Sequence, residues 1–375
     1  MPDLPEDLTA ILLEQVYYAA NFRPDVATLK SCALVSSSWS AQSQKLLFRS
    51  IRFHNNPHDN RKLQHFLGAI DPLSERGRYL GSCVRTIDIH VSERGTVHCS
   101  VLDFRFILEN CPRLYEVILS IDMHQFDDTT MDALRTISAD SGRGAIRALT
   151  LRCGVQSPIL YQLLQLWPTV QFLRIATELA APPPSQPLTA QFYELVLFRV
   201  PTQAPFTWLL SNSLQSLEIV DFRELPEKCM DHLLESLGPR LRSLRLLRYN
   251  SRAAAVVKFF TKLEELVLFQ LSSFLGLENL PQTLEHLSFR NFPWSSSPSL
   301  QSVISAIDTL PQLRIVSCDS STKDHPDFPL LSLKCSERNI KLLTDASPLF
   351  VSLEDPVPVV RFPRRKSVAN FALMN

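Results

Sequence analysis

The sequence predicts an α/β fold in which a small helical module precedes a repeat solenoid with a curved parallel sheet. Three observations predict it: helical apolar spacing in the first fifty residues, a strand pattern that recurs every 21 to 32 residues, and helical stretches between its recurrences. The composition, with 45% hydrophobic and 20% charged residues, is that of a globular protein. We expect a helical domain over 1–55, the solenoid over 56–320, and a C-terminal cap and tail over 321–375.

Charge and composition exclude several classes of function. Lys plus Arg equals Asp plus Glu, at 38 each, so no net field favours nucleic acid or an anionic membrane as a partner. No stretch approaches the roughly 18 apolar residues of a membrane span, so we expect a cytoplasmic or nuclear protein. Eight scattered cysteines are typical of reduced thiols, and the scarcity of glycine, at 9 residues, argues against phosphate-cradling loops.

Three short helices are predicted at the N-terminus. The first covers residues 4–16, where Pro5 stands at the start and apolar residues follow at spacings of three and four. The second covers about 25–38, and the third runs from Trp39 through Phe48. Such short helices cannot form a deep core alone, so part of their apolar surface must meet the rest of the chain or a partner. The apolar residues of the first helix are Leu8, Ile11, Leu12 and Val16.

Three motifs in this module carry a family resemblance. LP-x-D-L-x-x-I-L starts at Leu4, CALVSSSW runs from Cys32 to Trp39, and LLFRSI runs from Leu46 to Ile51. Together they resemble an F-box of the fungal type over roughly residues 3 to 51. The sequence departs from the family at Asp7, where Glu is commoner, and in a longer segment, VYYAANFRPDVATLK, between the first two helices.

The resemblance implies a function. F-box proteins dock on a Skp-type adaptor and through it on a cullin, so the chain would be the non-catalytic substrate-recognition subunit of an SCF-type ubiquitin ligase, without a cofactor. An alternative is that Trp39 and the leucines only pack the module onto the next domain. The residues that match the adaptor-contacting pattern are Leu4, Pro5, Leu8, Leu12, Leu34, Val35, Trp39 and Leu47.

The rest of the chain repeats one pattern, apolar-x-x-apolar-x-apolar. Self-similarity at this period is typical of leucine-rich repeats, here in a degenerate form with irregular lengths and no regular asparagine. The rival fold is a doubly wound α/β domain. Helices are expected between strands, for example over 102–109, 131–137, 159–166 and 230–237. The matches start at residues 84 (VRTIDI), 114 (LYEVIL), 146 (IRALTL), 170 (VQFLRI), 192 (FYELVL), 214 (LQSLEI), 241 (LRSLRL), 263 (LEELVL), 284 (LEHLSF) and 313 (LRIVSC).

Residues that flank the inward leucines project toward the hollow of such an arc. In the middle repeats they turn apolar, which predicts a patch where an unidentified target protein binds. The alternative is that the C-terminal segment covers this patch, because from residue 322 onward the repeat pattern is lost although Phe350, Val351, Phe362 and Phe371 remain. The candidate substrate-binding residues are Val196, Phe198, Val220, Arg245, Leu247, Val267, Phe269 and Arg290, with Glu194, Glu218 and Glu265 at the rim.

Motifs for chemistry are missing from the sequence. It has no G-x-S-x-G, G-x-x-x-x-G-K or H-E-x-x-H pattern. His90, His98 and Cys99 come nearest to a ligand cluster, but zinc needs four ligands in paired spacing, so we expect no metal. Three hypotheses remain: a ligase subunit, a scaffold of the same fold outside any ligase, and an α/β hydrolase or transferase. The last requires a close Ser, His and acid constellation, and cullin association separates the first two.

Overall fold

A computed structural model describes residues 4–17, 24–53, 57–93, 99–140, 145–272, 275–277, 279–290 and 299–345. These described residues divide into two compact units, unit 1 up to Phe172 and unit 2 from Leu173. The predicted tail, with Phe350, Val351, Phe362 and Phe371, lies outside the described residues. No described helix is long and apolar enough to cross a membrane. The domain limits expected at 55/56 and 320/321 stay predictions.

Unit 1 begins with helices at the three expected places: α1 (Glu6–Gln15), α2 (Val26–Cys32) and α3 (Ser37–Arg49). The expected second helix was too long. It ends at Cys32 because Ser36 caps the next helix, its hydroxyl oxygen accepting the N–H of Trp39 at 3.4 Å. Asp25 caps α2 in the same way at Thr28, and these hydrogen bonds lower the pKa of the Asp25 carboxyl.

Strand–helix repeats fill the rest of unit 1. Strands β1 to β4 pair in parallel and in chain order, so residues two apart on a strand share one face. On the helix side, Ile87, Val117 and Leu149 form one fully buried row across the strands. The elements are β1 (Ser50–Arg52), α4 (Pro57–Ala69), α5 (Glu75–Cys83), β2 (Thr86–Val91), α6 (Val101–Asn110), β3 (Glu116–Ile121), α7 (Asp128–Ser138), β4 (Ala148–Arg152) and α8 (Ile159–Leu166), and β5 (Phe172–Ile175) begins at the unit's limit.

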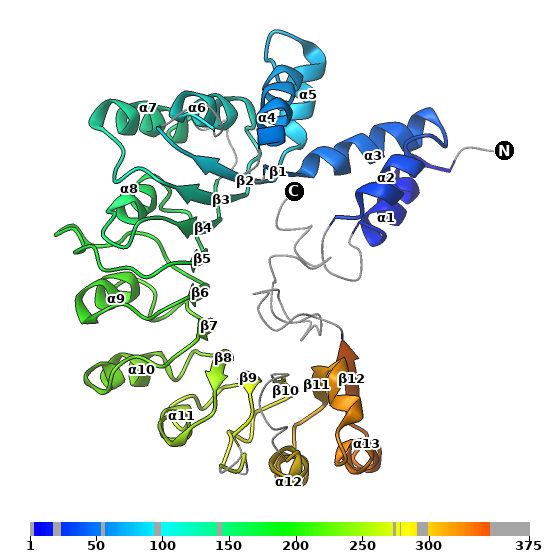
Figure 1. The fold of residues 1–375 in the computed structure, drawn as a ribbon, viewed down its shortest axis with the longest axis vertical. Helices are drawn as coiled ribbons and strands as arrows, with labels where there is room; N and C mark the ends of the chain where they lie inside the picture. Colours follow the sequence, from blue (N-terminus) through cyan, green and yellow to red (C-terminus); the bar gives the residue numbers. More distant parts are fainter. Residues whose placement is uncertain are drawn as a thin grey trace. The chain divides into compact units, whose positions relative to one another are not determined.

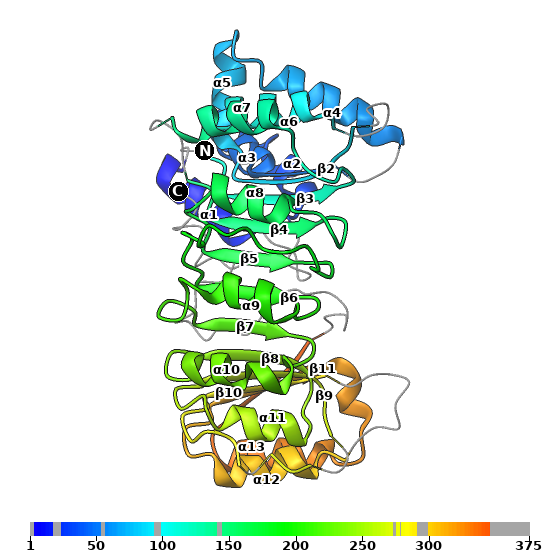
Figure 2. The same cartoon turned by 90° about the vertical axis from the view of Figure 1, so that its left-hand side faces the viewer.

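Unit 2 repeats the same architecture. Its strands also pair in parallel and in chain order, and Figure 1 shows β6 to β12 along an arc with α9 to α13 on its outer side. In Figure 2 the helices α9 and α10 lie in front of the strands of this unit. The elements are β6 (Glu194–Leu197), α9 (Gln203–Leu210), β7 (Ile219–Phe222), α10 (Asp231–Leu237), β8 (Ser243–Arg248), α11 (Ser251–Val257), β9 (Glu265–Gln270), β10 (His286–Phe289), α12 (Gln301–Thr309), β11 (Ile315–Asp319), α13 (Phe328–Glu337) and β12 (Lys341–Asp345).

The strand order confirms the repeat architecture. A doubly wound domain reverses its strand order at a switch point and covers both faces of the sheet with helices. Neither unit reverses its strand order over its described residues, so the rival fold is wrong for both.

The array also extends one repeat further than expected, since α13 and β12 continue it beyond residue 322. The pattern was hidden there because Thr344 takes the core position that Cys318 takes on β11.

Candidate protein-interaction surfaces

The apolar stripe of α1 faces outward. Leu8, Ile11, Leu12 and Val16 are all exposed, whereas Thr9, Leu13 and Tyr17 form the buried side of the helix, at spacings of four. The Thr9 hydroxyl is satisfied because it donates to the Pro5 carbonyl at 3.3 Å, which lets a polar residue face inward. Burial also raises the pKa of Tyr17 to about 12.

A small core holds the three helices together. It consists of Leu13, Tyr17, Leu29 and Leu46, and Cys32, Trp39 and Leu47 pack against it half-buried. Trp39 and Leu47, both expected at an adaptor interface, therefore lie at the edge of this core with part of each side chain exposed.

The other predicted adaptor-binding residues lie on the surface. Leu34 is 87% exposed and Val35 64%, in the turn between α2 and α3, and Leu8 on α1 is 49% exposed. Burying one such side chain fully contributes about 1.5 to 3 kcal/mol, so water contact at several of them is unfavourable. Leu4, Pro5, Leu8, Leu12, Leu34 and Val35 are all exposed.

On the strand face of unit 2 that points away from the helices, the register brings most predicted target-binding residues together. One row crosses the sheet through Val196, Arg245 and Val267. Phe198, Leu247, Phe269 and Arg290 follow two residues later on the same or the next strands. The candidates thus occupy two adjacent rows on the side of the strands that points away from the helices, and we call this whole side the inner strand face.

Val220 was placed on the wrong side of the sheet. It pairs with Leu195 and Leu244 and is fully buried on the helix side. The strand pattern matches twice here, at residues 214 and 217, and the structure uses the second match. A shift of three residues moves every side chain to the opposite face. The residues of β7 on the inner strand face are Ile219 and Asp221, and Arg223 follows just beyond the strand.

The same three-residue shift explains the position of Glu218, which was expected at the rim of the apolar patch. It lies one residue before β7, beside Arg242. That guanidinium binds Glu218 Oε2 at 3.0 Å and Glu264 Oε2 at 2.9 Å, which makes a charged ladder at the starts of three strands. The group links three neighbouring repeats at the starts of β7, β8 and β9.

Arg223 adds a contact that the sequence pattern concealed. Its guanidinium lies over the ring of Phe198 at 4.4 Å from the centroid, a cation–π contact between the ends of β6 and β7. Phe198 remains 39% exposed. Together the two residues form an amphipathic edge of the inner strand face.

A buried polar network occupies the same face of β8 to β11. Glu265 accepts a hydrogen bond from the Ser243 hydroxyl at 2.6 Å, and its other oxygen lies 3.1 Å from His286 Nδ1. His286 Nε2 lies 2.9 Å from Ser317 Oγ, and Arg245 is 3.6 Å from Glu265. Ser243, Glu265, His286 and Ser317 are all 0% exposed, and Arg245 is partly buried. Ion pairing and hydrogen bonding together offset the cost of placing these groups away from water.

Ser317, His286 and Glu265 have the order of a nucleophile, a base and an orienting acid. The Ser, His and acid constellation that a hydrolase would require is therefore present. However, Ser317 lies in the middle of β11, which pairs with strands on both sides, so the backbone amides around it serve the sheet rather than an oxyanion hole. The side chain itself is fully buried. The geometry fits a polar ladder better than a nucleophilic site.

Asp221 extends this network toward β7. It is buried, and burial raises the pKa of its carboxyl above the ordinary value, although Arg245 and Arg174 oppose that rise. Glu194, expected at the rim, is also buried. The acids of the inner strand face are thus largely removed from water.

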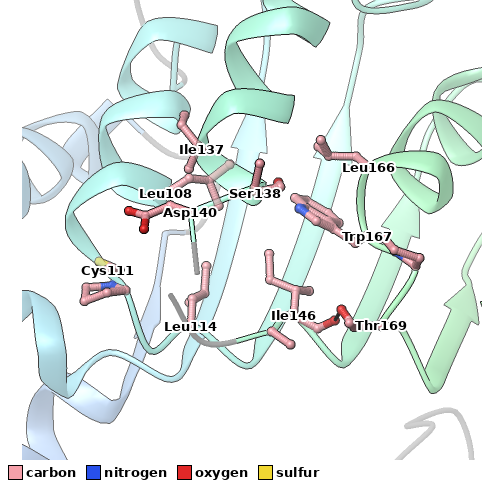
Figure 3. Close-up of a pocket in the computed structure, with 14 residues that line it drawn as sticks. Leu108, Cys111, Leu114, Ile137, Ser138, Asp140, Ile146, Leu166, Trp167 and Thr169 are labelled. Atoms are coloured by element: carbon pink, nitrogen blue, oxygen red, sulfur yellow. Dashed lines mark hydrogen bonds between the residues drawn. The ribbon is translucent and has the colours of Figure 1, made fainter. Parts of the chain in front are cut away.

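Unit 1 contains a separate pocket of about 260 Å³ where α6, α7 and α8 end. Leu166 and Trp167 line it on the side opposite Cys111 and Leu114 (Figure 3). Its walls are mostly apolar, and Asp140 supplies the acidic group. The volume lies just under the 300 to 1,000 Å³ of typical small-molecule sites.

Of the histidine and cysteine candidates, the structure describes His90 and Cys99, and neither belongs to a group that could hold a metal ion. His90 Nε2 lies 2.8 Å from Asp122, and Cys99 is buried, which raises the pKa of its thiol. His98 lies outside the described residues. Over the part of the chain that the structure describes, no group of three or more His, Cys, Asp or Glu side chains could hold a metal ion.

Comparisons with known proteins add little. No protein-family model matches the sequence, and no curated protein matches it. Among solved structures, the chain is similar to the leucine-rich repeat-containing protein LegL7 from Legionella pneumophila, at 16% identity and a TM-score of 0.45. The match covers 78% of this chain and 89% of that chain. A likeness this distant carries no argument about function.

Proposed function

We propose that this chain is the substrate-recognition subunit of an SCF-type cullin-RING ubiquitin ligase. The observation that supports it most directly is the exposure of Leu4, Leu8, Leu12, Leu34 and Val35 on one small helical module. These are the residues at which the sequence resembles the adaptor-contacting pattern of an F-box. A module that had only to pack onto its own chain would turn such side chains inward.

The interior of the module supports the same proposal. Leu13, Leu29 and Leu46 already supply a core, so the exposed leucines are not needed to hold the helices together. A surface that is apolar, built on helices and independent of the core suits an apolar groove on a helical adaptor.

In this proposal the repeats bind the target. Parallel strand–helix arrays offer extended surfaces for protein recognition, and the inner strand face of unit 2 combines Phe198, Leu247 and Phe269 with arginines. The chain itself makes no bond. It raises the effective concentration of the target near a ubiquitin-loaded enzyme in the assembled ligase.

The test is binding of the purified full chain to a recombinant Skp-type adaptor. Leu8→Asp combined with Leu34→Asp should weaken binding at least about 100-fold, because two charges would be buried in an apolar interface. Leu102→Asp is the matched control, since Leu102 is 74% exposed on α6 and lies outside the module. Its affinity should stay unchanged.

Failure of the wild-type chain to bind any Skp-type adaptor at low salt would overturn the proposal, as would equal losses in the test and control variants. The scaffold alternative predicts adaptor binding without a cullin. Co-purification of the cullin with the wild-type chain, lost in the Leu8 and Leu34 variant, distinguishes the ligase subunit from the scaffold.

A further inference from the structure

Several side chains on the inner strand face of unit 2 are more deeply buried than the described elements around them explain. The described helices α9 to α13 all lie on the other face of the strands (Figure 1). Nevertheless Glu265, His286, Ser288 and Ser317 are fully buried, and Val267 nearly so. Alternation along each strand places these side chains opposite Leu266 and its neighbours in the core. Water is therefore excluded from both faces of this part of the sheet.

A neighbouring segment of the chain has the reach to cover this face. Residues 346–362 follow β12 directly, and these 17 residues span up to about 56 Å when extended. Strands β6 to β12 are separated by six spacings of about 4.8 Å, or about 29 Å in all. The segment can therefore run from β12 back to β6 with length to spare.

The composition of 346–362 suits an extended apolar strap. Pro348, Pro356 and Pro358 oppose a helix and favour extended backbone. Its charged residues are Glu354, Asp355 and Arg361. Segments this apolar are unfavourable in water and need a surface to bury them. Its apolar side chains beyond alanine and proline are Leu349, Phe350, Val351, Leu353, Val357, Val359, Val360 and Phe362.

The inner strand face is complementary to this segment. It offers Val196, Leu247 and Phe269 to apolar side chains, and its arginines suit the paired acids Glu354 and Asp355.

We propose that residues 346–362 bind the inner strand face of unit 2 and act as a built-in competitor for any protein that uses it. This goes beyond the proposed ligase role and does not depend on it. A target must then displace the strap, so its apparent affinity is lowered by the fraction of chains in which the strap is bound.

Photo-crosslinking of the full chain tests the contact directly. Phe269→p-benzoyl-phenylalanine places a crosslinker on the inner strand face with little change of shape. We expect an intramolecular crosslink to a peptide within 346–362, identified by mass spectrometry. Leu333→p-benzoyl-phenylalanine, on the exposed side of α13, is the control and should not reach that peptide. Crosslinks from position 269 only to other segments, to a second copy or to nothing would overturn the proposal.

Thiol accessibility gives an independent readout in the full chain. Ser288→Cys should react slowly with an alkylating reagent. Adding Phe350→Asp, Val351→Asp, Val359→Asp and Val360→Asp should speed this reaction at least about tenfold, because the strap is released. Val368→Asp with Phe371→Asp, outside 346–362, is the matched control and should leave the rate unchanged.

Native Cys318 separates strap release from unfolding. It is fully buried on the helix side of β11, next to the strand that carries Ser288. Its reactivity should not change in the strap variant. An unchanged rate for the thiol introduced at position 288 would overturn the proposal, and if both thiols become reactive, the crosslink from position 269 decides.

Discussion

Each unit departs from the usual rule that apolar side chains are buried and polar ones exposed. Unit 1 departs from it with exposed apolar residues and unit 2 with buried polar residues. In unit 1, Leu8, Leu34 and Val35 are apolar and exposed, although a complete small core lies beneath them. In unit 2, Glu265 and His286 are polar and buried on the strand face opposite that unit's own described helices. The first arrangement is the basis of the proposed docking surface. The second is a set of polar groups that hydrogen-bond to one another within the sheet.

The difference teaches that burial and residue type must be considered together. Apolar side chains on a solvated surface gain free energy when a partner covers them, whereas buried charges lose it unless their partners stay in place. Unit 1 should therefore tolerate polar substitution at its surface, and unit 2 should not tolerate loss of a network member.

The largest expected effect is in unit 2. Glu265→Ala should lower the free energy of unfolding by about 4 kcal/mol, because Ser243, Arg245 and His286 lose their buried partner. Glu264→Ala is the matched control, one residue away in a partly exposed ion pair, and should cost about 1 kcal/mol. Urea denaturation of the full chains measures both. Equal, small losses would break the comparison by showing that Glu265 is solvated.

A smaller effect sharpens the description of unit 1. Leu13→Ala should destabilise the module by about 3 kcal/mol, because it opens a cavity beside Tyr17, Leu29 and Leu46. Leu12→Ala, the preceding residue on the exposed side, should change stability by less than about 0.5 kcal/mol. Thermal unfolding followed by circular dichroism provides the measurement. Comparable losses would mean that the stripe packs inward and is not a docking surface.

The smallest effect is a pH dependence. Burial raises the pKa of Asp221 above its ordinary value of 3.8, so its ionisation opposes folding. Its contribution to stability is complete below the unfolded-state pKa and is lost as the pH rises through the folded-state pKa.

Asp221→Asn has no carboxyl group to ionise, so the variant does not undergo this loss of stability at higher pH. The melting temperature of the variant relative to the wild type should therefore rise as the pH increases above the ordinary carboxyl value of 3.8 in parallel scans. A relative fall would show that attraction to Arg245 and Arg174 outweighs burial.

Much of the repeat array could be predicted before the structure. The helix over 159–166 has the expected limits, and every matched segment contains or adjoins a strand. Period and apolar spacing suffice for this because each repeat must bury the same stripe against its neighbours. β12 was not predicted, because Thr344 holds one of its core positions and interrupts the apolar pattern. The backbone pairing nevertheless continues.

The sequence by itself determined the strand order from β2 to β11, the parallel repeat and the apolar character of the N-terminal module. Only the tertiary structure decided which side of α1 is buried, since Thr9, Leu13 and Tyr17 share the helical spacing of the leucine stripe. It also decided that Val220 faces the core and Asp221 the inner strand face, and that Glu265, His286 and Ser317 meet. The physical reason is that local periodicity determines which residues share a face of a helix or strand. Which of those faces is buried depends on register and on packing between segments distant in sequence.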